Sequence, residues 1–280
     1  MAVISPVRPS PITGSWYPGD PVVLRNTVTS YMDAAEVKPL DGSVIGLISP
    51  HAGYIYSGPT AGYAYQAVKG LSFDLVVVLS PLHAYRPEPF LTSAHESYET
   101  PLGNIEVAKS SLVDLRTELE RTAGLEITPI AYDREHSLEI QLPFLQCALS
   151  SHFYILPLMV REHREKPLKS FSQALARILE GKRVLLVAST DLSHFFTEDE
   201  ANRLDDHMLA QIQAFSPEGV LKAEEDGTGS ACGNGAVAAT LWTARELGAK
   251  KVSILHHSTS AQTTGDRSQV VGYGAAAICS

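Results

Sequence analysis

The sequence predicts a single α/β domain with a central, mostly parallel sheet flanked by helices. Six short apolar runs have the composition of strands. These runs are continuous rather than alternating, which is typical of strands buried on both faces of a parallel sheet. Amphipathic segments of helical length separate them, and such strand–helix alternation is the pattern of layered α/β folds. The length of 280 residues also suits one large α/β domain.

The strands are predicted at residues 44–49, 74–80, 153–160, 183–189, 251–257 and 270–278. The first helix is expected to follow Asp20, a favourable N-cap residue, with Pro21 in its first turn, and to run to about Ala35. Further helices are predicted at 59–68, 110–122, 136–149, 167–179, 199–215 and 235–247.

No segment has the composition of a linker, so residues 1–280 are expected to form one domain. The opening contains Pro6, Pro9 and Pro11, which predicts an irregular N-terminal arm over residues 1–15. The acidic and glycine-rich stretch 224–230 predicts a surface loop.

Composition excludes several classes of function. The formal net charge of −9 argues against binding to nucleic acid. Three widely spaced cysteines are not a disulfide framework and suit a reducing compartment. The N-terminus lacks a signal-peptide pattern, and the apolar runs are far shorter than a membrane span. A cytoplasmic protein without a membrane segment is therefore expected, and the sequence neither requires nor excludes a homodimer.

Histidines follow three of the predicted strands directly. His51 comes after 44–49, His83 after 74–80, and the strand 183–189 leads into Asp191 and His194. The carboxyl ends of parallel strands share one edge of the sheet, where ligands bind in open α/β folds. A single histidine in this position is more often structural, but three at equivalent positions favour a common functional crevice.

Cys232 is a further candidate because it lies among glycines just before the helix 235–247. Glycines permit tight backbone paths, and a thiol beside a helix N-terminus ionises more readily. A thiolate with two imidazoles is plausible ligation for iron, copper or zinc. A small core thiol beside packing glycines is the alternative. Cys147 and Cys279 have the contexts of structural residues.

Acidic and aromatic residues extend this site. Four carboxylates are candidates to bind a metal or to orient a histidine: Glu135, Glu139, Asp191 and Asp266. Tyr54 and Tyr56 follow His51 closely and could either wall a pocket for a planar ligand or pack in the core. The sequence lacks the phosphate-binding, dinucleotide-binding, nucleophile-elbow and zincin motifs, which argues against those enzyme classes.

The combination of motifs resembles the Memo family, whose prokaryotic members are called AmmeMemoRadiSam system protein B. The resemblance covers almost the whole chain and is carried, in order, by GSWYP (14–18), SPHAGY (49–54), EHSLE (135–139), STDLSH (189–194) and ACG (231–233). It implies a fold similar to class III extradiol dioxygenases of the LigB type, which hold Fe(II) with two histidines and one carboxylate.

Matched motif by motif, the resemblance implies that His51 and His83 bind a metal, iron (Fe²⁺) or copper. It implies that Cys232 takes the place of the carboxylate and that His194 serves in acid–base chemistry, with Asp191 beside it in the pocket. Zinc is the less favoured metal. AMMECR-type and radical S-adenosylmethionine proteins are the implied partners, and the small-molecule or peptide ligand is not identified.

A thiolate is softer and more easily oxidised than a carboxylate, so ring cleavage does not follow from the fold. Three hypotheses therefore stand. The first is a non-haem metal-dependent oxidoreductase that uses His51, His83, Cys232 and His194. The second is a binding or adaptor protein with a vestigial pocket. The third is a metal-free enzyme with Cys232 as nucleophile and a histidine as base.

Overall fold

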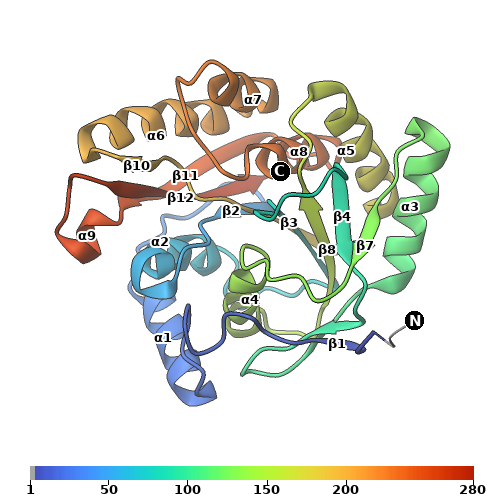
Figure 1. Ribbon diagram of the computed structural model, residues 1–280, viewed down its shortest axis with the longest axis horizontal. Helices are drawn as coiled ribbons and strands as arrows, with labels where there is room; N and C mark the ends of the chain where they lie inside the picture. The colour runs from blue at the N-terminus through green and yellow to red at the C-terminus, as the bar shows by residue number, and fades with distance from the viewer. Residues whose placement is uncertain (1–3) are drawn as a thin grey trace.

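The computed structural model, which describes residues 4–280, has a mixed nine-stranded sheet between two layers of helices (Figure 1). The strands in spatial order are β10 (His194–Phe196), β12 (Val270–Cys279), β2 (Val44–Ser49), β9 (Val184–Ser189), β3 (Leu75–Ser80), β8 (Tyr154–Val160), β4 (Phe90–Ser93) and β7 (Thr128–Ile130), with β11 (Lys251–Thr259) paired to β12.

At the centre of the sheet, the neighbours β2–β9–β3–β8 are parallel, whereas β12 runs antiparallel to β2, and β4 antiparallel to β8. This arrangement confirms the predicted fold class.

Both faces of the sheet are buried, as the continuous apolar runs predict. In β3, Val77 and Leu79 point into one core, and Val76 and Val78 point into the other. The second core is covered by α1 (Pro21–Asp33), α2 (Tyr54–Gln66) and α4 (Leu142–Ala148), which lie below the sheet in Figure 1. The first core is covered by α3 (Lys109–Ala123), α5 (Glu165–Leu179), α6 (Glu198–Gln213), α7 (Pro217–Glu225) and α8 (Asn234–Glu246). None of the helices in residues 4–280 combines the length and hydrophobicity that crossing a membrane requires.

Helix α2 starts five residues before the predicted start at Pro59. Proline inside a helix leaves the carbonyl four residues earlier without its usual partner. Here the Ile55 carbonyl accepts a hydrogen bond of 3.0 Å from Thr263 Oγ1, beside the short helix α9 (Ala261–Thr264). A contact from a distant segment therefore allows the helix to run through the proline.

Two further regions differ from the sequence prediction. Residues 136–149 were predicted as one helix, but a loop precedes the 3-10 helix η1 (Glu139–Gln141) and α4. The predicted loop 224–230 begins within α7, a helix that the sequence pattern did not reveal. Its N-cap is Ser216, whose side chain accepts from the Gly219 N–H.

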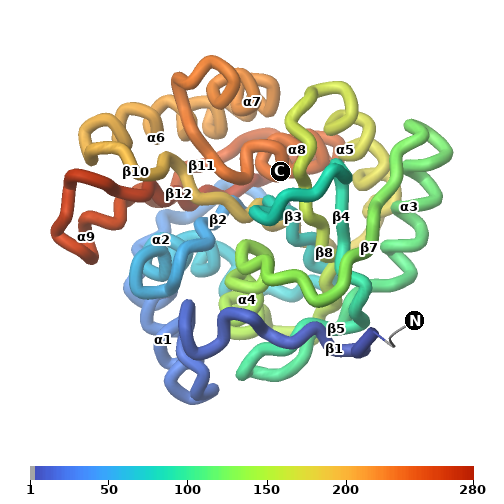
Figure 2. The backbone as a smooth tube through the Cα atoms, viewed as in Figure 1, coloured from blue at the N-terminus to red at the C-terminus, as the bar shows by residue number. Residues whose placement is uncertain are grey.

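The N-terminal segment is held firmly against the domain. Residues 1–3 of the predicted arm lie outside the described residues, and Val7–Arg8 forms β1, which pairs with β5 (Ser97–Tyr98). Strand β5 pairs in turn with β6 (Ile105–Glu106). Figure 2 shows the dark-blue arm passing beside the segment that precedes α4.

Arg8 joins this arm to the segment 133–139. Its side chain is 1% exposed and forms ion pairs of 2.6 Å with Asp133 and with Glu139. The same guanidinium group donates to the Glu135 carbonyl at 2.7 Å and lies over the Tyr98 ring. Several charge-assisted hydrogen bonds from one buried cation therefore tie this loop to the N-terminal arm.

Replacing Arg8 with methionine is expected to lower the free energy of unfolding by about 3–5 kcal/mol, because two buried carboxylates lose their counter-charge. Urea unfolding followed by circular dichroism measures this change. Arg183→Met is the matched control, since it removes an exposed ion pair with Asp74, and its urea midpoint should hardly move. Equal shifts in the two variants would contradict the anchoring role of Arg8.

Candidate metal centre

The strand order brings the predicted site residues to one edge of the sheet. Strand β9 lies between β2 and β3, and all three are parallel. The chain leaves β2 and β3 through Pro50 and Pro81, each of which lacks the N–H that would continue the ladder. His51 and His83 follow these prolines on either side of the end of β9.

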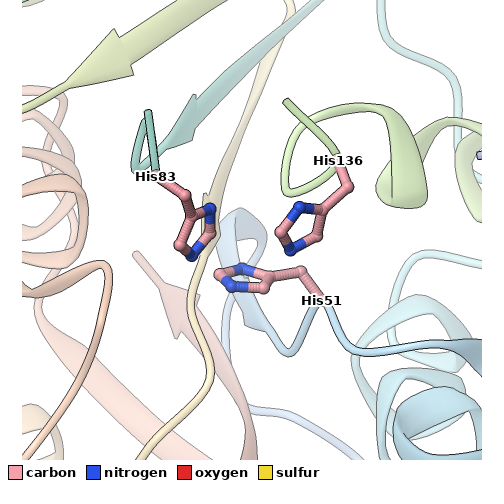
Figure 3. Close-up of side chains that lie close together, drawn as sticks. All are labelled: His51, His83 and His136. Carbon is pink, nitrogen blue, oxygen red and sulfur yellow. The ribbon is translucent and has the colours of Figure 1, made fainter. Parts of the chain in front are cut away.

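Three imidazoles meet at this edge (Figure 3). The described part of the chain contains one group of three metal-ligating side chains whose donor atoms all lie within 4.8 Å of one another, and it consists of His51, His83 and His136. The rings of His83 and His136 are stacked with centroids 4.6 Å apart, and His51 meets both edge-on. The cluster draws on three segments that are distant in sequence.

The hydrogen bonds around His51 determine which ring nitrogen carries the proton. Ser189 Oγ donates to the Ser137 carbonyl at 2.6 Å, so it can only accept from His51 Nδ1, at 3.0 Å. Gln141 Nε2 also donates to this hydroxyl oxygen, at 2.7 Å. His51 Nδ1 is therefore protonated, and the Nε2 lone pair faces the site. Burial and the neighbouring His83 lower the pKa of His51 to about 3, so the ring is neutral.

His83 is held in the same tautomer by a carboxylate. Its Nδ1 lies 2.9 Å from Glu135 Oε1, and its backbone N–H donates to Glu135 Oε2 at 2.6 Å. The hydrogen bond between His83 Nδ1 and Glu135 raises the pKa of His83. Burial alone would raise the pKa of Glu135, but the contacts from His83 and from backbone N–H groups hold it well below its usual range.

Cys232 lies next to His51 but outside the group of three histidines. Its Sγ is 3.2 Å from His51 Nε2 and accepts from the Asp191 N–H at 3.3 Å. Burial raises the pKa of this thiol, opposite to the effect expected from the nearby helix N-terminus. The approach of Cys232 to β9 requires Gly233, because a Cβ there would lie 2.5 Å from the Ser189 carbonyl oxygen.

Asp191 connects the cysteine to the first histidine. Its Oδ1 accepts from the His51 backbone N–H at 2.7 Å, and its side chain is 5% exposed. Burial raises the pKa of this carboxyl to about 6. Asp191 therefore fixes the turn that follows β2 and also faces the adjoining cavity.

A cavity of about 500 Å³ opens beside the cluster. Asp191, His194 and His136 form part of its wall, and four aromatic residues also line it: Trp16, Tyr56, Phe195 and Tyr273. Phe195 has a left-handed φ of 64° at an irregularity in the β10–β12 pairing, and its ring is 69% exposed. Backbone strain of this kind is characteristic of functional sites.

The structure thus brings His51, His83, Asp191 and Cys232 together and places His194 on the cavity wall. Tyr56 lines this cavity, whereas Tyr54 is buried and donates to the Ile140 carbonyl. Glu139 pairs with Arg8, and Asp266 caps an exposed turn, so neither faces the three imidazoles.

His136 was not predicted from the sequence as a candidate ligand. It follows β7, a three-residue strand with proline at its centre, which gives no recognisable strand signal. Strand β7 is also antiparallel to β8 and hence to β2, β9 and β3, so its carboxyl end lies at the opposite edge of the sheet, and the argument that led to His51 and His83 does not lead to His136. The one sequence feature that could have indicated His136 as a ligand is the acidic residue directly before it, Glu135.

Comparisons with known proteins agree with this architecture. The family model of the Memo-like proteins matches residues 8–277. A MEMO1 family protein of Nitrosopumilus maritimus is 32% identical over 274 residues, which cover 96% of this chain and 98% of the relative. A MEMO1 family protein of Sulfolobus acidocaldarius is 32% identical over 282 residues, which cover 95% and 97% of the two chains.

The fold is also found in a solved structure of an uncharacterised Escherichia coli K12 protein. The two share a TM-score of 0.54 at 12% sequence identity, and the match covers 84% of this chain and 99% of the other. At this identity the likeness concerns the fold alone. The family match spans nearly the whole sequence and includes every motif of the site, and this chain belongs to the family of Memo-like proteins.

Proposed function

We propose that this site binds a redox-active metal, iron(II) or copper, through His51, His83 and Cys232, and that the protein is a non-haem metal-dependent oxidoreductase. The observation that carries the proposal is the convergence of two imidazoles from the ends of β2 and β3, on either side of β9. One of them, His51, lies 3.2 Å from a thiol sulfur. His136 completes a set of three imidazoles that could hold a metal ion.

The sulfur of Cys232 and Nε2 of His51 have the spacing of two ligands of one metal ion. A four-coordinate metal with bonds of about 2.0 Å to nitrogen and 2.3 Å to sulfur separates adjacent ligand atoms by roughly 3.5 Å. The sulfur of Cys232 and Nε2 of His51 are 3.2 Å apart, which is close to this spacing. Imidazole suits iron and copper, and a thiolate favours copper(I).

A bound iron or copper ion would supply one-electron redox chemistry that side chains cannot. The remaining residues act on the ligand in the cavity. His194 lies on the cavity wall, partly exposed, where its imidazole can take up or release a proton. Asp191 holds the His51 turn, and the rings of Trp16 and Phe195 offer apolar contacts to a ligand in the cavity.

Metal content provides the first test. Protein prepared anaerobically without a metal-affinity tag is expected to hold about one iron or copper ion per chain, because the proposed ligands form one site. Elemental analysis measures this content. His51→Ala and His83→Ala should each lose the ion, because the remaining ligands are too few.

His152→Ala is the control for this measurement, since His152 is exposed and contacts Tyr154. Its metal content should equal that of the wild type. A wild-type protein that takes up neither iron nor copper after anaerobic addition would contradict the proposal and favour the binding or thiol-based alternatives.

The third ligand is identified by cobalt(II) substitution. We expect a near-ultraviolet thiolate-to-cobalt charge-transfer band in the wild type. This band should be lost in Cys232→Ser, because the hydroxyl oxygen of serine gives no such band. His136→Ala should retain it. If the band is absent and His136→Ala instead abolishes cobalt binding, the metal is held by the three histidines and the role of Cys232 is wrong.

A further inference from the structure

Glu135 is a buried carboxylate that contacts an imidazole of the site as well as the backbone of its own turn. It is 5% exposed and lies between β7 and η1. Four N–H groups face its two oxygens: His83 Nδ1 at 2.9 Å and the backbone groups of His83, His136 and Ser137 at 2.6, 3.0 and 2.9 Å. The carboxylate therefore contacts two of the three histidine-bearing segments.

We propose that Glu135 is a positioning residue that orients the three imidazoles of the site without binding the metal itself. The inference rests on the proposed function, because it concerns the same site. It adds a defined role for a residue that lies outside the group of possible ligands.

The direct action of Glu135 is on His83. A carboxylate can only accept, so the proton must be on Nδ1, and Nε2 is left to face the site. Because the backbone N–H of the same residue donates to the other carboxylate oxygen, the main chain and the ring of His83 are fixed together. A carboxylate in this arrangement also increases the basicity of a metal-binding imidazole.

Glu135 also acts on the other two histidines, because its Oε1 lies 3.5 Å from His136 Nδ1 and contacts the backbone of 136–137, which leads to His51. Glu135 Oε1 accepts from the N–H groups of His136 and Ser137. The Ser137 carbonyl accepts from Ser189 Oγ, and that hydroxyl oxygen accepts from His51 Nδ1. Hydrogen bonds on both sides of the Ser137 backbone therefore connect Glu135 to the His51 ring, in addition to its contacts with His83 and His136.

Glu162 provides a matched control within the same protein. It is also 5% exposed, and its Oε1 accepts from the next two backbone N–H groups, His163 and Arg164, at 3.0 and 2.9 Å. Its side chain pairs with the Arg164 guanidinium rather than with an imidazole of the site. Glu162→Gln thus makes the same chemical change at a buried turn of the same kind that does not contact the three imidazoles.

The first measurement uses metal-free protein and ¹⁵N NMR of the imidazoles at alkaline pH, where the rings are neutral. In the wild type and in Glu162→Gln, His83 should show a protonated Nδ1 and an unprotonated Nε2. In Glu135→Gln the side-chain amide can donate as well as accept, so the two His83 tautomers should become mixed. An unchanged His83 tautomer in Glu135→Gln would overturn the proposal.

The second measurement is cobalt(II) affinity by competition with a chelator. Glu135→Gln should bind about 10- to 100-fold more weakly than the wild type, as is usual when a carboxylate partner of a ligating histidine is lost. Glu162→Gln should match the wild type. Equal losses in both variants would assign Glu135 a purely structural role.

Glu135→Asp keeps the proposal testable if Glu135→Gln does not fold. It retains the charge on a shorter side chain, so we expect the wild-type tautomer and an intermediate affinity. Full loss of affinity in Glu135→Asp with the tautomer unchanged would contradict positioning through His83. If the wild type binds no cobalt, the proposed function fails, and the NMR comparison alone decides the role of Glu135.

Discussion

The buried guanidinium group of Arg8 connects the first strand of the chain to the segment that carries Glu135 and His136. Two of its partners, Asp133 and the Glu135 carbonyl, belong to a stretch without regular secondary structure, and the third, Glu139, is the first residue of η1. Main-chain hydrogen bonds of a helix or strand do not fix such a stretch, so side-chain contacts must. The position of one imidazole thus depends on a residue more than a hundred positions earlier.

The second constraint is the parallel order of β2, β9 and β3. It places two proline-terminated strands on either side of a third and leads the chain into His51 and His83 at one edge. The segment 137–141 fills the space between these strand ends, because Gln141 donates to the Pro50 carbonyl and Ser137 to the Pro81 carbonyl. The rigid sheet positions two histidines, and the loop above it contributes the third.

The sequence was sufficient for the long elements and insufficient for the short ones. The predicted strand 74–80 contains the continuous apolar run 75–79, rich in valine and typical of a buried strand, and β3 lies where expected. Strands such as β7 and β1, of three and two residues, have no periodicity to detect. The early start of α2 depends on Thr263, which no local pattern could indicate.

The same distinction applies to the site. His51 and His83 were predicted because they follow recognisable strands, and Cys232 because of its glycine-rich context. His136 lies in the loop between β7 and η1 rather than directly after a parallel strand, and the sequence pattern assigned it to a helix. The anchoring of this segment by Arg8 joins residues distant in sequence, and a single sequence contains no record of such a contact.

The position of Trp16 gives the site an intrinsic optical reporter. The indole is 36% exposed, lines the cavity, and lies with its ring centroid 4.2 Å from that of His136. The other of the two tryptophans, Trp242, is buried in α8 and donates to Glu218. Indole fluorescence therefore combines a steady contribution from the core with a contribution sensitive to the site, and changes at the imidazole cluster can be followed without any added label.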